Sequence, residues 1–352
     1  MSVHFHKLKI AEVVPETAEA VSLRFDIPPE LEETFAFKPG QHLTLRATID
    51  GEEVRRNYSL CTAPDERDWM VTIKRMPRGY FSQWAPQNLK AGDLIEVMEP
   101  HGSFTTEFDP ANERHLVGIA GGSGITPVMS LIKSTLRSEP QSQFTLLYGN
   151  RDSSSVIFLD ALADLKDKYL DRFEVYHFLD QEEQEIELFN GMLDRARCEE
   201  AIEHLVPDAG AVDGWFICGP GPMMDAAEGA LLDRGIGKER IRIERFTAEA
   251  TPGAVTREIA ALQTKAEGLT VSVTLDGRTR RVPFTAVLLG RSDIPDLQLE
   301  PPHDPVLFLS ATPITATEAA WVRLKGAEAM RQAWESDGVD VLDSNRRAAQ
   351  PN

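Results

Sequence analysis

The stretch Gly121-Gly122-Ser123-Gly124-Ile125-Thr126-Pro127 decides the fold, because it joins an apolar strand at His115–Ala120 to a helix at about Pro127–Arg137. Glycines let a backbone approach a pyrophosphate closely, and the N-terminus of the next helix favours negative charge. The stretch lacks the G-x-G-x-x-G spacing of the dinucleotide fold, since Pro127 opens the helix instead. A plain strand-to-helix turn would not require three glycines within four positions. The pattern therefore favours a phosphate-binding turn.

Strands and helices alternate on the C-terminal side of this turn, which is typical of a parallel sheet with helices on both faces. The predicted strands are Phe144–Tyr148, Phe173–Phe178, Gly214–Cys218 and Ile241–Phe246, and the predicted helices are Leu159–Tyr169 and Met223–Arg234. Ligands of such sheets bind beyond the carboxyl ends of the strands. Residues 111–248 are therefore expected to form an α/β domain with a nucleotide site at that edge.

On the N-terminal side, residues 1–110 form closely spaced short strands, which predicts a small antiparallel barrel. The predicted strands, separated by turn signals such as Pro39-Gly40, are Ala20–Phe25, His42–Ala47, Trp69–Lys74 and Leu94–Met98. Beyond a linker at 249–268, residues 270–284 predict a β-hairpin around Asp276-Gly277. The fold class is therefore α+β multidomain, with a third region at 269–352.

The composition of the 352 residues limits the function classes. A net charge of −19 argues against nucleic acid as a partner, because phosphate backbones bind to basic surfaces. The three cysteines (Cys61, Cys198 and Cys218) have neither disulfide nor zinc spacing, so we expect no metal site and a reducing, cytoplasmic location. The N-terminus has no signal-peptide core, and no apolar run reaches membrane-spanning length, so no membrane partner is expected.

The motif Arg56-Asn57-Tyr58-Ser59-Leu60 carries the side chains that a flavin requires. Arg56 supplies charge for a pyrophosphate, Tyr58 a flat surface against the ring, and Ser59 a hydroxyl close to the reactive ring nitrogen. The alternative is an edge strand with a solvated arginine, which the motif taken alone would favour.

Two further turns have both a chemical and a plain interpretation. Gly79-Tyr80-Phe81-Ser82 follows the strand that ends in Lys74, and a glycine before a helix-starting Ser82 would present free N–H groups to a phosphate. An ordinary capped helix explains this turn equally well. Cys218-Gly219-Pro220 ends another strand, where a small thiol and a flexible backbone would admit a nicotinamide ring. A lone cysteine is nevertheless more often a small buried hydrophobe.

The order of these motifs along residues 1–247 resembles that of the ferredoxin–NADP reductase superfamily. Within it, the chain is similar to the reductase components of phenylacetyl-CoA epoxidases. That similarity rests on four runs: Pro39-Gly40-Gln41-His42-Leu43, Arg55-Arg56-Asn57-Tyr58-Ser59, Tyr148-Gly149-Asn150-Arg151 and Glu244-Arg245-Phe246.

The resemblance implies an FAD-dependent NAD(P)H oxidoreductase that passes electrons to an oxygenase component or a soluble electron carrier. It implies FAD in a six-stranded barrel and NADPH or NADH on the α/β domain. Ser59, Cys218 and Glu244 would lie at the reacting rings as catalytic residues. The residues expected to bind the cofactors are Arg56, Tyr58, Ser59, Lys74, Gly79, Phe81, Ser82, Gly122, Gly124, Thr126, Arg151, Ser153, Gly219, Pro220 and Phe246.

The choice of nicotinamide nucleotide rests on a short loop. Arg151 and Ser153 follow a predicted strand and could bind an adenosine 2′-phosphate, which favours NADPH over NADH. The alternative is a solvated loop arginine.

The resemblance ends in the third region. Reductases of the subgroup carry a plant-type ferredoxin domain whose [2Fe–2S] cluster is bound by cysteines, but no cysteine follows Cys218 here. No cluster is therefore expected. Residues 269–352 are interpreted either as a degenerate β-grasp ferredoxin-like remnant or, after Phe284, as the product of an altered reading frame without a selected fold.

Two alternatives to a reductase of the phenylacetyl-CoA oxygenase system stay open. One is a reductase that serves a different oxygenase. The other is a non-catalytic protein that senses nucleotides on the same scaffold. The intact Tyr58-Ser59 and Gly122–Thr126 motifs argue against the sensor.

Overall fold

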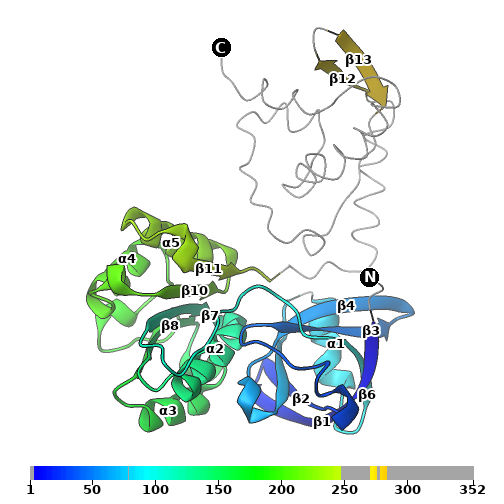
Figure 1. Ribbon diagram of the computed structural model, residues 1–352, viewed down its shortest axis with the longest axis horizontal. Helices are drawn as coiled ribbons and strands as arrows, with labels where there is room; N and C mark the ends of the chain where they lie inside the picture. The colour runs from blue at the N-terminus through cyan, green and yellow to red at the C-terminus, as the bar shows by residue number, and fades with distance from the viewer. Residues whose placement is uncertain (1–3, 78, 247–269, 276–277, 284–352) are drawn as a thin grey trace. The chain divides into compact units, whose positions relative to one another are not determined.

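The computed structural model describes residues 4–77, 79–246, 270–275 and 278–283, the last two ranges by their backbone alone. The chain divides into two units, Met1–Glu249 and Ala250–Asn352. All the site residues predicted from the sequence lie in the first unit, which contains a barrel domain and an α/β domain (Figure 1).

The barrel domain is a six-stranded antiparallel sheet. Its strands are β1 (Phe5–Thr17), β2 (Ala20–Asp26), β3 (His42–Ile49), β4 (Glu52–Ser59), β5 (Trp69–Lys74) and β6 (Leu94–Met98). They are hydrogen-bonded in the order β4-β3-β6-β1-β2-β5, and an isolated bridge between Leu60 and Val71 joins the two ends of this order. The six-stranded antiparallel barrel predicted from the sequence is thus confirmed.

Alternating side chains fill the interior of the barrel. Leu8 and Ile10 of β1 and Leu43 and Leu45 of β3 are fully buried, because side chains two positions apart in a strand point to the same face. Helix α1 (Tyr80–Asn88) adds Phe81 to the same core. This packing fixes the place where β3 begins and β4 ends, and the predicted flavin motif lies there.

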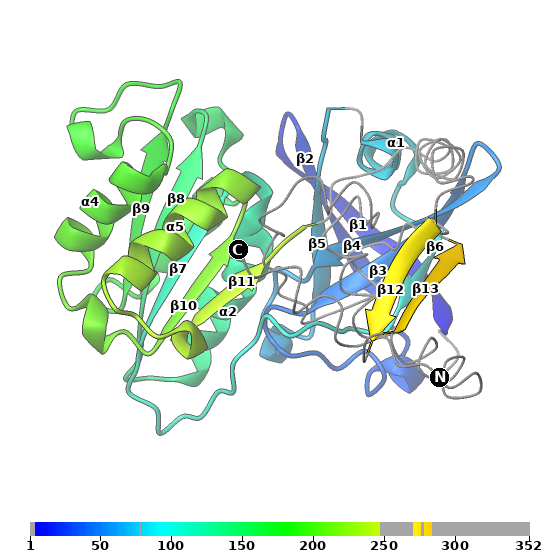
Figure 2. The same ribbon diagram turned by 90° about the horizontal axis from the view of Figure 1, so that it is seen from above.

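The α/β domain is a five-stranded parallel sheet with helices on both faces (Figure 2). Its strands are β7 (His115–Gly121), β8 (Gln143–Asn150), β9 (Phe173–Leu179), β10 (Gly214–Cys218) and β11 (Ile241–Glu244), in the order β11-β10-β7-β8-β9. The chain runs outward from β7 to β9 and then returns to β10 on the other side of β7. The reversal places a topological switch point at the carboxyl ends of β7 and β10, where ligands of such sheets bind.

Two apolar cores, one on each face, hold the helices against this sheet. Helices α2 (Ile125–Ser138) and α3 (Leu159–Lys168) contribute Val128, Leu131 and Leu162 to one core. Helices α4 (Arg195–Leu205) and α5 (Gly221–Asp233) contribute Ile202 and Leu231 to the other. The predicted doubly covered sheet is confirmed, and α4 is an addition that the sequence pattern did not predict.

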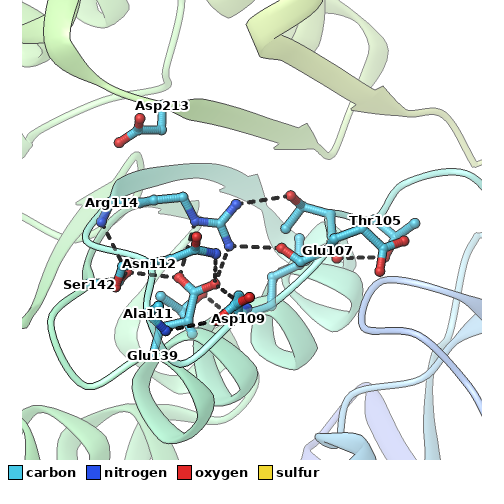
Figure 3. Close-up of polar contacts among 12 residues, drawn as sticks. Thr105, Glu107, Asp109, Ala111, Asn112, Arg114, Glu139, Ser142 and Asp213 are labelled. Carbon is cyan, nitrogen blue, oxygen red and sulfur yellow. Dashed lines mark hydrogen bonds and ion pairs between the residues drawn. The ribbon is translucent and has the colours of Figure 1, made fainter.

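The segment between β6 and β7 is tied to the α/β domain through one buried carboxylate (Figure 3). Glu139, directly after α2, is fully buried and accepts hydrogen bonds from Arg114 at 2.5 and 3.1 Å, Asn112 at 2.7 Å and Ser142 at 2.8 Å. Burial alone would raise the pKa of Glu139, but these hydrogen bonds hold it below its ordinary value. Because Arg114 also donates to the Thr106 hydroxyl, the network fixes the path of the connection between the two domains.

In the second unit, the structure describes a hairpin of β12 (Thr270–Leu275) and β13 (Arg278–Pro283). The predicted hairpin is confirmed, and its second strand, expected at Thr279–Phe284, begins and ends one residue earlier. The rest of the predicted third region and the linker at 249–268 lie outside the described residues.

Candidate functional site

The end of β4 and the start of β3 bring a buried hydroxyl and a buried imidazole together. Ser59 and His42 are register partners in this antiparallel pair, so their side chains point to the same face. Ser59 is 2% exposed, and its hydroxyl has no hydrogen-bond partner among the described residues; the same holds for both ring nitrogens of His42. Buried polar atoms are normally satisfied, so this face fits a bound group that carries hydrogen-bonding atoms of its own.

The His42 imidazole lies between two other titratable groups. Its ring centroid is 4.1 Å from that of His101, and its Nδ1 is 3.7 Å from the Glu244 carboxylate at the end of β11. Burial, assisted by His101, lowers the pKa of His42 to about 3, and burial raises the pKa of Glu244 to about 7. The His42–Glu244 contact therefore does not join two charged groups at neutral pH, although its distance is that of an ion pair.

The other two residues of the flavin motif lie on the same strand. Tyr58 is half-buried, and its ring centroid is 5.7 Å from that of Phe81. Phe81 itself is fully buried in the barrel core, and its side chain packs against the Tyr58 ring. Only the main chain of Phe81 could therefore contact a cofactor. Arg56 is half-buried and donates to the Arg55 carbonyl at 2.7 Å.

The turn before α1 differs in one detail from the sequence expectation. The helix begins at Tyr80, two residues before Ser82, and Gly79 is its N-cap. The Ser82 hydroxyl accepts a hydrogen bond from the Met76 backbone at 3.2 Å, so it also organises this turn. The N-terminus of α1 carries the positive end of the helix dipole, which favours an anion.

Two glycine-rich turns pack directly against each other at the switch point. A Cβ at Gly124 would lie 2.0 Å from the Cys218 carbonyl oxygen, and a Cβ at Gly219 would lie 2.9 Å from the Gly121 nitrogen. Gly124 and Gly219 are therefore required for packing, whatever they bind. Gly122 is different, because its φ of +51° favours glycine and its open side faces the Lys74 ammonium, 3.2 Å from a Cβ placed there.

The Gly122–Lys74 arrangement suits an anion. A helix N-terminus follows the turn, and Thr126 stabilises that terminus by donating to the Ser123 carbonyl at 3.0 Å. Desolvation by partial burial, together with the nearby Arg151, lowers the pKa of the half-buried Lys74. Lys74 places an ammonium group beside the turn, where a phosphate would lie.

Cys218 and Glu244 end the two strands beside this turn. They are register partners in the parallel pair β10–β11. Cys218 is fully buried, and burial raises the pKa of its thiol well above the ordinary value, with the Glu244 carboxylate adding to the effect. The thiol is therefore protonated and uncharged at neutral pH. Pro220 is the N-cap of α5, and its ring lies 2.7 Å from a Cβ placed at Gly121.

A chain of contacts thus joins the predicted catalytic residues. Ser59 pairs with His42 across β3 and β4, His42 approaches Glu244, and Glu244 pairs with Cys218. In the sequence, His42 belongs only to the run Pro39–Leu43 of the family pattern, which assigns it no role. Its signal was its place at the start of a strand paired with the strand of Ser59.

The loop after β8 has partners that the sequence did not reveal. The Arg151 guanidinium forms an ion pair with Glu19 of the barrel at 2.7 Å. Ser153 donates its N–H and its hydroxyl to the Glu182 carboxylate, each at 2.7 Å. Phe246, two residues beyond β11, is 40% exposed, and its contact with a flavin stays a prediction.

A barrel with a half-buried Arg-x-Tyr-Ser strand, joined to a parallel sheet with a phosphate turn at its switch point, defines a flavin- and dinucleotide-binding oxidoreductase. Residues 7–106 match the model of the oxidoreductase FAD-binding domain, and residues 119–229 match that of the oxidoreductase NAD-binding domain. The chain belongs to the ferredoxin reductase family of flavin-dependent oxidoreductases, and its cofactors are FAD and a nicotinamide nucleotide.

The relatives of this chain include reductase components of oxygenases. It is 41% identical over 282 residues to one of the subunits of 1,2-phenylacetyl-CoA epoxidase from Escherichia coli (strain K12), covering 80% of this chain and 78% of the relative. It is 40% identical over 302 residues to the ferredoxin reductase component of 3-ketosteroid-9-alpha-monooxygenase from Mycobacterium tuberculosis (strain ATCC 25618 / H37Rv), covering 81% and 78%.

Solved structures show the same fold. The Amycolatopsis cytochrome P450 reductase matches with a TM-score of 0.61 at 24% identity, covering 71% of this chain and 72% of that one. The ferredoxin reductase in carbazole 1,9a-dioxygenase matches with a TM-score of 0.55 at 25% identity, covering 70% of each chain.

The second unit matches a different family model. Residues 259–347 match that of Suppressor of fused protein (SUFU). The match does not test whether the residues after Phe284 come from an altered reading frame, so that interpretation stays a prediction. The ferredoxin-like remnant stays a prediction, because most of residues 269–352 lie outside the described part of the chain.

Two features are absent from the described residues. None of the described helices is long and apolar enough to cross a membrane. Within the same residues, no group of three or more His, Cys, Asp or Glu side chains is arranged to hold a metal ion.

Proposed function

We propose that this chain carries electrons from NADPH, through FAD, to an oxygenase component of the phenylacetyl-CoA type. The observation that carries the proposal is the contact chain from Ser59 through His42 and Glu244 to Cys218. It joins the flavin strand of the barrel to the switch point of the nucleotide domain. Two relatives support this role: one is a subunit of 1,2-phenylacetyl-CoA epoxidase, and the other is the ferredoxin reductase component of a monooxygenase.

The barrel residues would hold FAD through three kinds of contact. Arg56 and the N-terminus of α1 at Gly79 would neutralise the pyrophosphate, and Tyr58, supported by Phe81, would cover the ring. The Ser59 hydroxyl would donate to the ring and so gain the hydrogen-bond partner that its buried position requires. Bound FAD supplies the ability to accept a hydride and release electrons one at a time.

The α/β residues would hold the nicotinamide nucleotide in the opposite half of the site. Gly122, Thr126 and the N-terminus of α2 would bind its pyrophosphate with Lys74. The uncharged Cys218 thiol and the Gly219-Pro220 turn would leave room for the nicotinamide ring without placing a charge beside it. Glu244, whose pKa burial raises to about 7, would orient the rings through hydrogen bonds.

NADPH is proposed as the preferred nucleotide because Arg151 and Ser153 follow β8 in the loop where an adenosine 2′-phosphate would lie. The absence of an iron–sulfur cluster and the cytoplasmic location are also parts of the proposal. Both rest on the sequence, in which no cysteine follows Cys218 and the three cysteines are far apart.

A second candidate is a reductase for a different oxygenase. The 40% identity to a ketosteroid monooxygenase reductase, nearly as high as the identity to the phenylacetyl-CoA epoxidase relative, keeps this candidate open. A nucleotide sensor is less well supported, because the flavin strand and the phosphate turn are both intact.

The test is steady-state reduction of ferricyanide by the FAD-loaded full chain with NADPH or NADH as donor. We expect turnover with both, and a higher kcat/KM for NADPH. Flavin retention without turnover would favour the sensor, and a higher kcat/KM for NADH would overturn the nucleotide assignment. Purified oxygenase components acting on phenylacetyl-CoA or on a ketosteroid then separate the two reductase candidates by product formation.

A further inference from the structure

Both groups that would bind an adenosine 2′-phosphate already have an anionic partner in this protein. Arg151 is paired with the Glu19 carboxylate at 2.7 Å. Ser153 gives its N–H and its hydroxyl to one oxygen of Glu182, at 2.7 Å in each case. The carboxylates therefore use the donors that a phosphate would use.

The backbone holds Glu182 in this position. The Gln181 N–H donates to the Arg151 carbonyl at 2.7 Å, and the Asp180 N–H donates to the Asn150 carbonyl at 3.2 Å. These bonds extend the pairing of β8 and β9 past the ends of both strands. Glu182 is thus placed beside Ser153 by the sheet itself.

Glu19 is held in a comparable way from the barrel side. Its carbonyl accepts the Arg75 N–H at 2.7 Å, which anchors the turn between β1 and β2 to the end of β5. Its carboxylate acts on both nearby cations, since it raises the pKa of Lys74 against the lowering effects of burial and Arg151. Glu19 therefore contributes a negative charge from the flavin domain to the edge of the nucleotide site.

We propose that Glu19 and Glu182 limit the preference for NADPH over NADH, because they occupy the donors that an adenosine 2′-phosphate must take over. The inference rests on the proposed function, in which Arg151 and Ser153 bind that phosphate. NADH leaves both contacts in place, whereas NADPH must displace two carboxylates and bring its phosphate close to them. Arg151, Glu19 and Glu182 are all substantially exposed, and exposed ion pairs contribute little free energy. Displacing the two carboxylates therefore costs little enough for NADPH still to bind.

The experiment measures binding of two probes to the FAD-loaded full chain by titration calorimetry. The probes are 2′,5′-ADP and 5′-AMP, which differ only in the 2′-phosphate. The variants are Glu182→Gln and Glu19→Gln, which keep the size and the acceptor oxygen but remove the charge. Glu185→Gln is the matched control, because Glu185 is an exposed glutamate of the same loop.

We expect each variant to bind 2′,5′-ADP about fivefold more tightly than the unmodified protein, with 5′-AMP affinity changed by less than about twofold. The Glu185→Gln control changes neither affinity. Unchanged 2′,5′-ADP binding in both variants overturns the inference, as does equal tightening of both probes, which would indicate a general change in surface charge.

Arg151→Ala separates failure of this inference from failure of the proposed function. This substitution should lower the affinity for 2′,5′-ADP more than the affinity for 5′-AMP. An equal loss of affinity for both probes would show that the 2′-phosphate does not contact this loop, and would overturn the inference. Flavin binding and turnover would still support a reductase. Loss of flavin binding and of turnover would instead count against the proposed function.

Discussion

At the flavin side of the molecule, the Ser59 hydroxyl and the His42 ring nitrogens are buried and have no hydrogen-bond partner among the described residues. At the nucleotide side, Arg151 and Ser153 are exposed and already paired with carboxylates. A buried group without a partner is costly until a ligand satisfies it, whereas an exposed paired group can exchange partners at little cost. This contrast is the one expected for a tightly bound flavin and a nicotinamide nucleotide that binds and dissociates in each turnover.

The largest effect is expected for Arg56→Ala. Loss of a charge-assisted contact to the FAD pyrophosphate should weaken flavin binding by about 10- to 100-fold. Arg55→Ala is the matched control, because Arg55 is exposed and pairs with Glu53 at 2.6 Å. The measurement is the ratio of flavin to protein absorbance after gel filtration. A normal ratio in Arg56→Ala would show that Arg56 does not contribute to FAD binding.

Gly124→Ala tests whether the two glycine-rich turns are packed as described. The added methyl group would lie 2.0 Å from the Cys218 carbonyl oxygen, so one turn must shift. We expect the free energy of unfolding to fall by about 1–3 kcal/mol in urea denaturation. Gly221→Ala is the control, because a Cβ there meets nothing within 4 Å. Equal stability of the two variants would contradict the contact between the turns.

The raised pKa of Glu244 predicts that the free energy of unfolding depends on pH. Burial raises its pKa to about 7, so between about pH 4.5 and 7 the folded state binds more protons than the unfolded state. The contribution of this group to the free energy of unfolding therefore decreases as pH rises through that window, by on the order of 1–3 kcal/mol. Glu244→Gln should flatten this part of the stability profile of the flavin-free protein. An unchanged profile would show that Glu244 is not buried as described.

Ser59→Ala should have the smallest effect on stability. Removing a buried hydroxyl without a partner leaves the free energy of unfolding of the flavin-free protein unchanged or raises it by less than about 1 kcal/mol. The rate of flavin reduction by NADPH, measured by stopped-flow absorbance, should nevertheless fall at least about tenfold if the hydroxyl acts on the ring. A clear loss of stability without flavin would mean that Ser59 has a structural partner.

The sequence predicted those parts of the fold that follow from local pattern. Strands bounded by glycine and proline, such as Trp69–Lys74 and Gly214–Cys218, have the predicted limits. Strand β1 (Phe5–Thr17) was missed, because the alternation of Lys7–Ile10 is short and breaks down at Val13-Val14-Pro15. Helix α4 (Arg195–Leu205) was missed as well, since charged residues fill most of its exposed face and leave a weak apolar pattern.

The site was predictable in its elements and less so in its contacts. Tyr58, Ser59 and Gly122 could be found because each belongs to a motif within one segment. Glu19 and Glu182 are separated by 132 and 29 residues from their partners Arg151 and Ser153, so only the folded chain brings them together. Polar contacts at such separations leave no local signal in a single sequence.

The most direct test of this account is the anaerobic absorption spectrum of the full chain after gel filtration, before and after addition of NADPH. We predict a flavin spectrum that survives the column and bleaches on addition, without the broad absorbance in the red that an iron–sulfur cluster would give. A colourless protein that cannot be reconstituted with FAD would contradict the flavin site on which the comparison depends.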